Sequence, residues 1–276
     1  MRTPGLQEST TRRGARRRPG PLARWRLGLL GIVLATGLLG ADARAEWGVD
    51  ATVEHFALRE HITPIEVHEN GPRTALGIGF IQAKERGLLL AYRGVVYGGS
   101  VGYNGSFQFD RTEAARGASL YLGTTQGVEV RYRWPGALDA IAGLDVDLWR
   151  RRLSTTQFED YRFLSGRVGL RRPATASGRV VGGAGIRFLL ATAEHAKVTD
   201  AGLSYRLILS PGLGSNPFLE LGYQVAPRLT LIGYWDGMRL GQTDPVVLRK
   251  NGRPQATVFQ PATDIDVVGV RLAYRL

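Results

Sequence analysis

The sequence contains no cysteine and only two methionines among its 276 residues. The absence of cysteine excludes a disulfide framework, a thiolate metal site and a cysteine nucleophile. After Glu46 no segment carries the 3.6-residue apolar stripe of an amphipathic helix. An apolar run over 27–41 has 15 residues. As a helix it is about 22 Å long, against the roughly 30 Å hydrocarbon core of a bilayer.

The positive charge of the chain is concentrated at its beginning. The whole sequence has 36 Lys+Arg against 24 Asp+Glu, a formal charge of +12. The first 45 residues hold nine arginines and two acids, which leaves 27 bases and 22 acids, or +5, for the rest. A nucleic-acid partner, which the basic total would otherwise suggest, is therefore not expected.

The first 45 residues have the three parts of a secretory signal peptide. A basic stretch over 12–26 precedes the apolar run 27–41, and Ala43 and Ala45 supply the small residues that a signal peptidase reads. The apolar run is too short for the alternative, a transmembrane anchor. The pair Arg12-Arg13 lacks the apolar residues that usually follow a twin-arginine signal. We therefore expect 1–45 to be a signal peptide and 46–276 to be one exported domain beginning at Glu46.

The exported domain alternates with a period of two, as half-buried strands do. The last segment is the clearest: Val268, Val270, Leu272, Tyr274 and Leu276 share one face, and Arg271 and Arg275 lie on the other. Ten such segments can be found, at 47–54, 76–80, 88–96, 128–134, 144–148, 164–171, 179–191, 219–225, 229–236 and 268–276.

The connections between these segments alternate strictly between short and long. The short ones lie near 84–87, 135–138, 173–178 and 226–228, and the long ones near 60–74, 98–118, 151–160, 192–216 and 237–264. A soluble sandwich has no reason for that regularity, whereas a transmembrane barrel has tight periplasmic turns and longer outer loops. The pattern predicts an all-β, antiparallel up-and-down transmembrane β-barrel of ten strands, each 10–13 residues long. Eight strands remain the alternative, because the segments 75–83 and 203–209 are weak.

The charges predict which face of each strand meets lipid. An arginine or lysine at the membrane midplane costs roughly 2–4 kcal/mol, so the apolar set should face outward and the charged set inward. The predicted interfacial girdles contain Trp47, Trp134, Trp149 and Trp235, although Trp149 shares the parity of the inward Asp145 and Asp147. The predicted lumen network consists of Asp50, Glu54, Arg93, Glu129, Arg131, Arg133, Asp145, Asp147, Arg167, Arg171, Arg187, Glu220, Arg271 and Arg275.

These six acids and eight arginines nearly cancel, which favours a closed lumen. A selective pore usually carries one sign along its constriction, whereas a narrow barrel filled with side chains needs paired charges. Ten strands are also close to the size at which side chains fill the interior. We expect Glu129, Arg131, Asp145 and Asp147 to form one cluster at mid-depth. The alternative is a small-solute channel gated through the arginine-lined lumen.

The C-terminal strand resembles that of bacterial outer-membrane β-barrel proteins, which usually end in alternating apolar residues and a terminal aromatic read by the assembly machinery. The matching residues are Gly269, Leu272, Tyr274 and Leu276, with Leu276 standing where Phe is commonest. The resemblance implies a Gram-negative outer-membrane location and contact with the barrel assembly machinery. The charged loops would suit lipopolysaccharide phosphates. No specific family is matched.

The candidate catalytic and metal motifs are weak. Gly98–Gly102 fits G-x-S-x-G without the strand-to-helix elbow that the motif requires. His55 and His195 each follow a glutamate directly, and neighbours in a strand point to opposite faces. The spacings of outer-membrane proteases and lipid deacylases do not occur. The polar residues Glu60, His61, Glu66, His68 and Glu69 could gather a divalent ion but are expected to form a solvated loop.

We therefore expect no catalytic site, no cofactor and no metal. The predicted function is that of an integral outer-membrane barrel with a charge-paired closed lumen, long surface loops and a structural or surface-interaction role. A rim enzyme acting on lipid or peptide remains a further alternative.

Overall fold

The computed structural model describes residues 45–83, 86–106, 114–135, 138–174, 178–198, 203–207, 210–211, 216–250 and 253–276. The expected signal peptide, including Ala43, lies outside the described residues, and Ala45 is the first residue of strand β1. Nowhere in these described ranges is there a helix long and apolar enough to cross a membrane.

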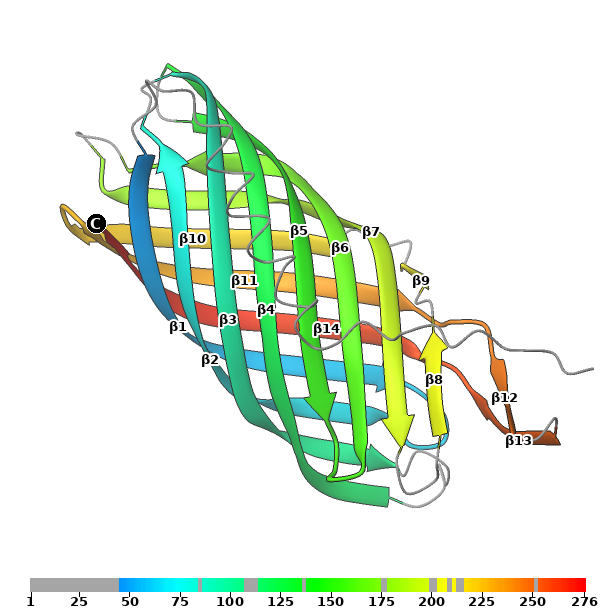
Figure 1. Ribbon diagram of the computed structural model, residues 1–276. Coiled ribbons are helices and arrows are strands. Elements are labelled where there is room, and N and C mark those ends of the chain that lie inside the picture. The colour runs from blue at the N-terminus through cyan, green and yellow to red at the C-terminus, as the bar shows by residue number, and fades with distance from the viewer. Residues whose placement is uncertain are drawn as a thin grey trace, which may run out of the picture. The chain divides into compact units, whose positions relative to one another are not determined.

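Within the described residues ten long antiparallel strands form a closed ring (Figure 1). They are β1 (Ala45–His61), β2 (Val67–Gln82), β3 (Gly87–Ser106), β4 (Ala114–Trp134), β5 (Leu138–Arg152), β6 (Gln157–Arg172), β7 (Val180–Val198), β10 (Asn216–Ala226), β11 (Leu229–Gly241) and β14 (Ala262–Arg275). The ring closes where β14 pairs with both β11 and β1. The predicted ten-stranded up-and-down barrel is thus confirmed, and the eight-stranded alternative is wrong.

The two segments whose alternation is weak, 75–83 and 203–209, differ in their place in the structure. Residues 75–82 belong to β2, a full member of the ring. Residues 203–207 form β8 (Leu203–Leu207), which pairs with β7 and lies outside the ring.

The strands are longer, and several loops shorter, than the sequence predicted. The ring strands run from 11 to 21 residues, and only residues 62–66 separate β1 from β2 where a loop over 60–74 was expected. Likewise, 153–156 replace the expected loop 151–160. The barrel wall continues past the apolar segments, and there both faces of each strand carry polar residues, so the period-two signal disappears although the strand does not.

The strand register places the apolar set on the outside. Val53 and Val270 are opposite one another on β1 and β14, and their side chains are 63 % and 52 % exposed. Their neighbours Thr52 and Arg271 are also opposite one another but are buried in the lumen. Exposed Val, Leu, Ile, Phe, Tyr and Trp side chains continue around all ten strands and form what we call the apolar belt. A soluble protein rarely exposes so large a continuous apolar surface.

The belt ends well before the strands do. On the side of the loops its last outward residues include Val53 on β1, Leu76 on β2, Val146 on β5, Leu164 on β6 and Val268 on β14. Beyond that line the outward face is polar, with the ion pair Arg150–Asp160 as an example. We call this half of the barrel the loop end and the opposite half the turn end.

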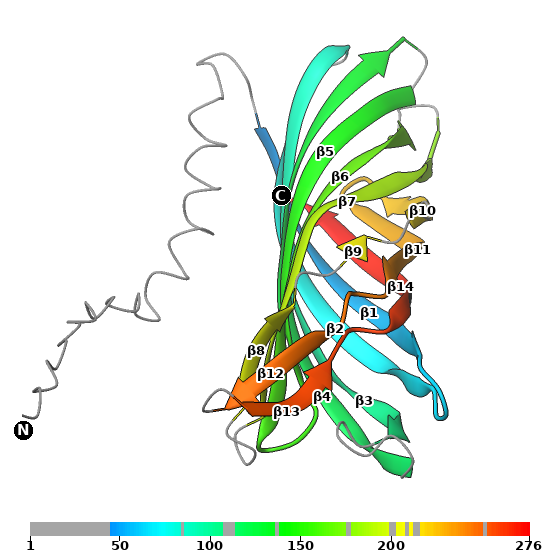
Figure 2. The same ribbon diagram turned by 90° about the vertical axis from the view of Figure 1, so that its right-hand side faces the viewer.

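The loop end carries all the extra strands. The two-stranded β12 (Val246–Lys250) and β13 (Arg253–Val258) project from it as a hairpin, and β9 (Ser210–Pro211) pairs with the end of β11 (Figures 1 and 2). The base of the hairpin is fixed where the Thr243 amide donates to the Gln260 carbonyl oxygen at 3.0 Å.

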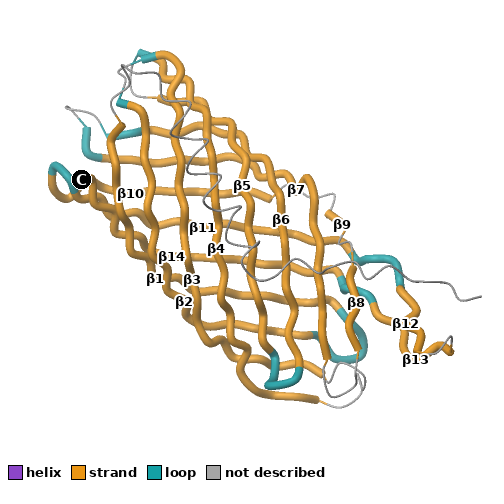
Figure 3. The backbone as a smooth tube through the Cα atoms, in the orientation of Figure 1, coloured by secondary structure: helices purple, strands orange, loops and turns teal. Residues whose placement is uncertain are grey.

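The even strand number returns the C-terminus to the turn end, where β1 begins (Figures 1 and 3). The Leu276 amide donates to the Trp47 carbonyl oxygen at 2.9 Å. Leu272, Tyr274 and Leu276 face outward in the belt, whereas Gly269 faces inward beneath the Tyr234 ring, where a Cβ atom would collide.

Candidate functional site

The lumen is the candidate site, because the register turns every charged residue predicted for it inward. This set is Asp50, Glu54, Arg93, Glu129, Arg131, Arg133, Asp145, Asp147, Arg167, Arg171, Arg187, Glu220, Arg271 and Arg275. The lumen divides along its axis into a vestibule at the turn end, an aromatic plug and an acidic cluster at the loop end.

Ion pairs line the vestibule. Asp50 accepts from Arg93 at 2.8 Å and Glu129 from Arg131 at 2.5 Å. Glycines opposite the carboxylates make room for such pairs: a Cβ at Gly77 would collide with the carboxylate of Asp50. Pairing matters here because an unpartnered buried charge is costly.

The expected single cluster of Glu129, Arg131, Asp145 and Asp147 does not form. Asp145 instead pairs with Arg167 on the neighbouring strand. Asp147 lies deeper and accepts hydrogen bonds from the Tyr97 hydroxyl at 2.8 Å and from Thr125 at 3.1 Å. The four residues are on adjacent strands as predicted, but Arg167 on β6 pairs with Asp145, and Tyr97 and Thr125 donate to Asp147.

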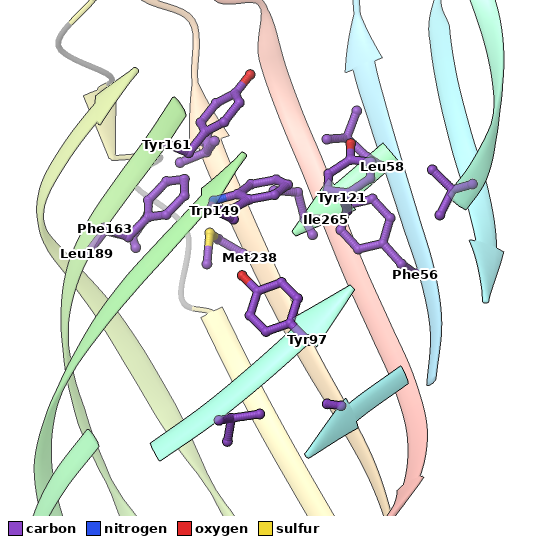
Figure 4. Close-up of a cluster of buried hydrophobic side chains, with 14 of the residues drawn as sticks. Phe56, Leu58, Tyr97, Tyr121, Trp149, Tyr161, Phe163, Leu189, Met238 and Ile265 are labelled. Carbon is purple, nitrogen blue, oxygen red and sulfur yellow. The ribbon is translucent and has the colours of Figure 1, made fainter. Parts of the chain in front are cut away.

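The plug consists of aromatic and aliphatic side chains that meet across the lumen (Figure 4). Trp149 is its centre and is only 6 % exposed. Its ring stacks between Tyr121, at a centroid distance of 5.2 Å, and Tyr161, at 4.7 Å. Phe56, Leu58, Tyr97, Phe163, Leu189, Met238 and Ile265 complete the layer. The placement of Trp149 in an outer girdle was therefore wrong, and the parity that pointed inward was right.

A buried arginine joins the plug to the lumen charges. The Arg73 guanidinium lies over the Phe56 ring at 4.1 Å and over the Tyr97 ring at 4.7 Å. Its Nε donates to Glu54 at 2.8 Å. Such cation–π contacts are stronger out of water. Sequence analysis missed Arg73 because residues 60–74 were assigned to a loop.

The acidic cluster lies beyond the plug, above the apolar belt. Arg151 donates to Glu60 at 2.9 Å, to Glu69 at 2.6 Å and to Glu159 at 2.9 Å. Glu69 also accepts from Ser119 at 2.8 Å. Glu60 and Glu69 were expected to be solvated, but they are buried because the strands extend past the belt.

The residues considered for a metal are thereby separated. Glu60 and Glu69 face the lumen, whereas Glu66 lies outside, 3.6 Å from His61 and 3.2 Å from His68. Within the ranges that the structure describes, no group of three or more His, Asp or Glu side chains is arranged to hold a metal ion.

Glu194 adds a fourth carboxylate to the acidic cluster. It is 2 % exposed, and its Oε2 has no hydrogen-bond partner in the described part of the chain. Burial, together with the nearby charges of Glu159 and Glu60, raises the pKa of Glu194 well above its usual value, although Arg151 opposes this. The pKa of Glu159 is raised too, again mainly by burial.

These raised pKa values link stability to pH. Above the ordinary glutamate pKa of 4.5 the folded barrel holds protons that the unfolded chain has released. Stability therefore falls as the pH rises through this window, until the folded carboxyls ionise as well.

The catalytic motifs are not assembled as catalysis would require. Gly98–Gly102 lies inside the straight strand β3, not on an elbow. Glu54 and Glu194 face the lumen, and the histidines that follow them, His55 and His195, face outward.

A cavity of about 710 Å³ occupies the vestibule. It opens at the turn end, where Trp47, Pro173 and Pro227 line it, and reaches inward to Val95 and Thr125. The next inward residues of the same strands, Tyr97 on β3 and Gly123 on β4, already belong to the layer of the plug. Nine arginines and five carboxylates line the cavity.

No protein-family profile matches the sequence, and no curated protein matches it. Solved structures do match the fold. The outer membrane protease OmpT from Escherichia coli is 9 % identical, with 85 % of this chain and 97 % of that chain covered and a TM-score of 0.49. The translocator domain of the autotransporter NalP from Neisseria meningitidis is 9 % identical, with 92 % and 97 % covered and a TM-score of 0.40.

A third match is Ail, the attachment invasion locus protein of Yersinia pestis, at 9 % identity, with 84 % and 99 % covered and a TM-score of 0.36. Similarities this low transfer neither activity nor partners. The strand pairing of the chain itself shows the closed-barrel architecture of bacterial outer-membrane β-barrel proteins.

Proposed function

We propose that this chain is an integral outer-membrane protein of a Gram-negative bacterium whose lumen is closed, so that it acts as a membrane-seated scaffold and not as a pore. The plug around Trp149 is the observation that carries the proposal. The apolar belt supports the membrane location, because its side chains face outward on all ten strands.

Closure follows from the packing of the plug. Ions cross a membrane protein only along a hydrated path, and a ring of ten strands is narrow enough for side chains to block it. Trp149, Tyr121 and Phe163 come from different strands and are each less than 7 % exposed. A layer packed in this way would leave no continuous hydrated path through the lumen.

The orientation follows from the connections. Short turns face the periplasm in barrels of this kind, so the loop end would lie outside the cell. There the exposed guanidinium groups of Arg59 and Arg162 stand just above the belt, where lipid phosphates would lie. We propose lipopolysaccharide as their partner, since guanidinium binds phosphate in a forked geometry. We also propose that the C-terminal strand β14 is read by the barrel assembly machinery.

The test combines location with conductance. The protein should be recovered with outer membranes, and its unheated band should migrate differently from its heated band on a gel. Purified and reconstituted in planar bilayers, it should be silent or open rarely. Steady conductance would overturn closure and favour the second candidate, a small-solute channel, which the open half of the lumen at the vestibule supports.

A further inference from the structure

The vestibule carries more guanidinium groups than its own carboxylates need. Nine arginines and five carboxylates line it, and one of the arginines, Arg133, pairs with a sixth carboxylate, Asp139, outside the lining. No lysine or histidine is among the described lining residues. Arginine presents planar, forked donors that match phosphate and carboxylate oxygens. An interior used only for filling could pair its charges one to one.

Glu220 is the point where the imbalance is clearest. Arg171 approaches its Oε2 at 3.2 Å, and Arg271 approaches its Oε1 at 2.9 Å. Gly183 lies in register between Arg171 and Glu220, so no side chain separates them. Two guanidinium groups thus share a single carboxylate.

Spare donors remain after this pairing. The Nε of Arg171 is buried and has no hydrogen-bond partner within the described residues, while 20 % of the Arg171 side chain is exposed. Arg93, on the facing wall, gives its Nε and Nη2 to Asp50 and keeps 41 % of its side chain exposed in the cavity. A ligand with several anionic oxygens would satisfy donors that the protein leaves open.

We propose that the vestibule binds a small phosphate-bearing anion between Arg171 and Arg271, with Glu220 acting as an internal competitor for the same donors. The cavity volume of about 710 Å³ falls within the usual range for small-molecule pockets. Phosphate is favoured because it offers up to two charges and three strong acceptor oxygens to converging forks. The site opens at the turn end, and it does not depend on whether the barrel conducts.

Calorimetric titration of inorganic pyrophosphate into the refolded full barrel in a zwitterionic detergent tests the proposal. Glu220→Gln releases both arginines and should tighten binding about tenfold, the equivalent of one charge-assisted hydrogen bond. The triple variant R171Q/E220Q/R271Q leaves no unpaired charge and should weaken binding at least about tenfold. Arg150→Gln, on the outer wall, is the control and should leave binding unchanged.

Each variant is first checked for the shift in gel mobility that a folded barrel shows on heating. A variant that passes this check and binds more weakly has lost binding and not its fold. The proposal is overturned if Glu220→Gln leaves binding unchanged or weakens it, if the triple variant binds as the wild type does, or if Arg150→Gln has the same effect. Two competitors distinguish the source of the phosphate. Displacement by glycerol 3-phosphate supports a soluble ligand, and displacement by short-chain phosphatidylglycerol alone supports a lipid headgroup at the same site.

Discussion

Replacing Trp149 with alanine should both destabilise the barrel and open its lumen. The indole contacts more aromatic rings than any other side chain of the described plug. Its centroid lies 4.7 Å from Tyr161, 5.2 Å from Tyr121, 5.9 Å from Phe163 and 6.0 Å from Phe56. No other single substitution removes as much of the layer that separates the vestibule from the loop end.

The expected cost follows from these contacts. Truncating a buried tryptophan to alanine costs about 3–5 kcal/mol, and each aromatic pair contributes about 0.5–1.5 kcal/mol of interaction beyond its buried area. Since two of the pairs are close stacks, we expect a loss near the upper end, about 4–5 kcal/mol. Urea unfolding of protein refolded into lipid vesicles, followed by fluorescence of the remaining tryptophans, measures this loss.

Planar-bilayer recordings measure the opening. The indole lies between the rings of Tyr121 and Tyr161, whose hydroxyl groups donate to Glu69 and Glu159 in the acidic cluster, so water can enter the vacated space from that side. We expect frequent openings that favour anions, because the ions then pass the arginine-lined vestibule. Trp149→Phe should remain silent and lose much less stability.

The matched control is Trp134→Ala, since Trp134 lies on the outer face and contacts Tyr132 at 5.6 Å. It should not change conductance. A Trp149→Ala barrel that stays silent and loses less than about 1 kcal/mol of unfolding free energy would refute the reasoning, because truncating a tryptophan at the centre of a packed layer costs more than that.

Three further predictions concern the acidic cluster, the lipid face and the N-terminus. Glu194→Gln should stabilise the barrel by about 1–3 kcal/mol at pH 7, because the buried carboxyl with its raised pKa must either take up a proton or bury a charge on folding, whereas the amide does neither. It should also reduce the fall in stability between pH 5 and pH 8, and a variant that follows the wild type across this range would contradict the assignment. Leu221→Arg places a guanidinium on the lipid face, where the side chain is 66 % exposed, and should cost roughly 2–4 kcal/mol. Gln224→Arg faces the lumen, and an equal loss of refolding yield for both variants would mean that the face assignment is wrong. N-terminal sequencing of protein extracted from membranes should begin at Glu46, and retention of residues 27–41 would rule out cleavage there.

The sequence predicted the barrel because alternation reports which side of a strand meets lipid. Val268, Val270 and Leu272 must stay apolar where they face hydrocarbon, and Arg271 must turn away from it. The same constraint acts on all ten strands, so strand number and the facing of each residue could be predicted without any contact information. The placement of Trp149 in the lumen also follows from parity once the tendency of tryptophan to lie at interfaces is set aside.

The loop end could not be predicted, for a physical reason. Beyond the belt the outer face meets water, so Arg59 and His61 on β1 are as polar as the inward Glu60 between them. A strand with polar residues on both faces has no period in hydrophobicity and looks like a loop. That is why the acidic cluster and Arg73 were missed, although the segments that contain them are continuous with strands that were found. Ion pairs between distant strands, such as that of Glu69 with Arg151, can be predicted only when the register of the strands is known. The hydrophobic pattern of the sequence does not give that register.

The distribution of charge along the lumen indicates that the side chains of the vestibule do more than fill the barrel. If the only requirement were to close the barrel, apolar side chains of similar volume would do so at lower cost, since buried ion pairs often stabilise no better than hydrophobic replacements. The chain does use apolar filling, but only in the plug. On the turn side of the plug it keeps arginines around a cavity of about 710 Å³, and on the loop side it keeps four glutamates around Arg151. Opposite charges on the two sides of a dry layer are not placed to neutralise one another. The arginines are instead available to anions that enter from the turn end, and the plug ensures that such anions stop there.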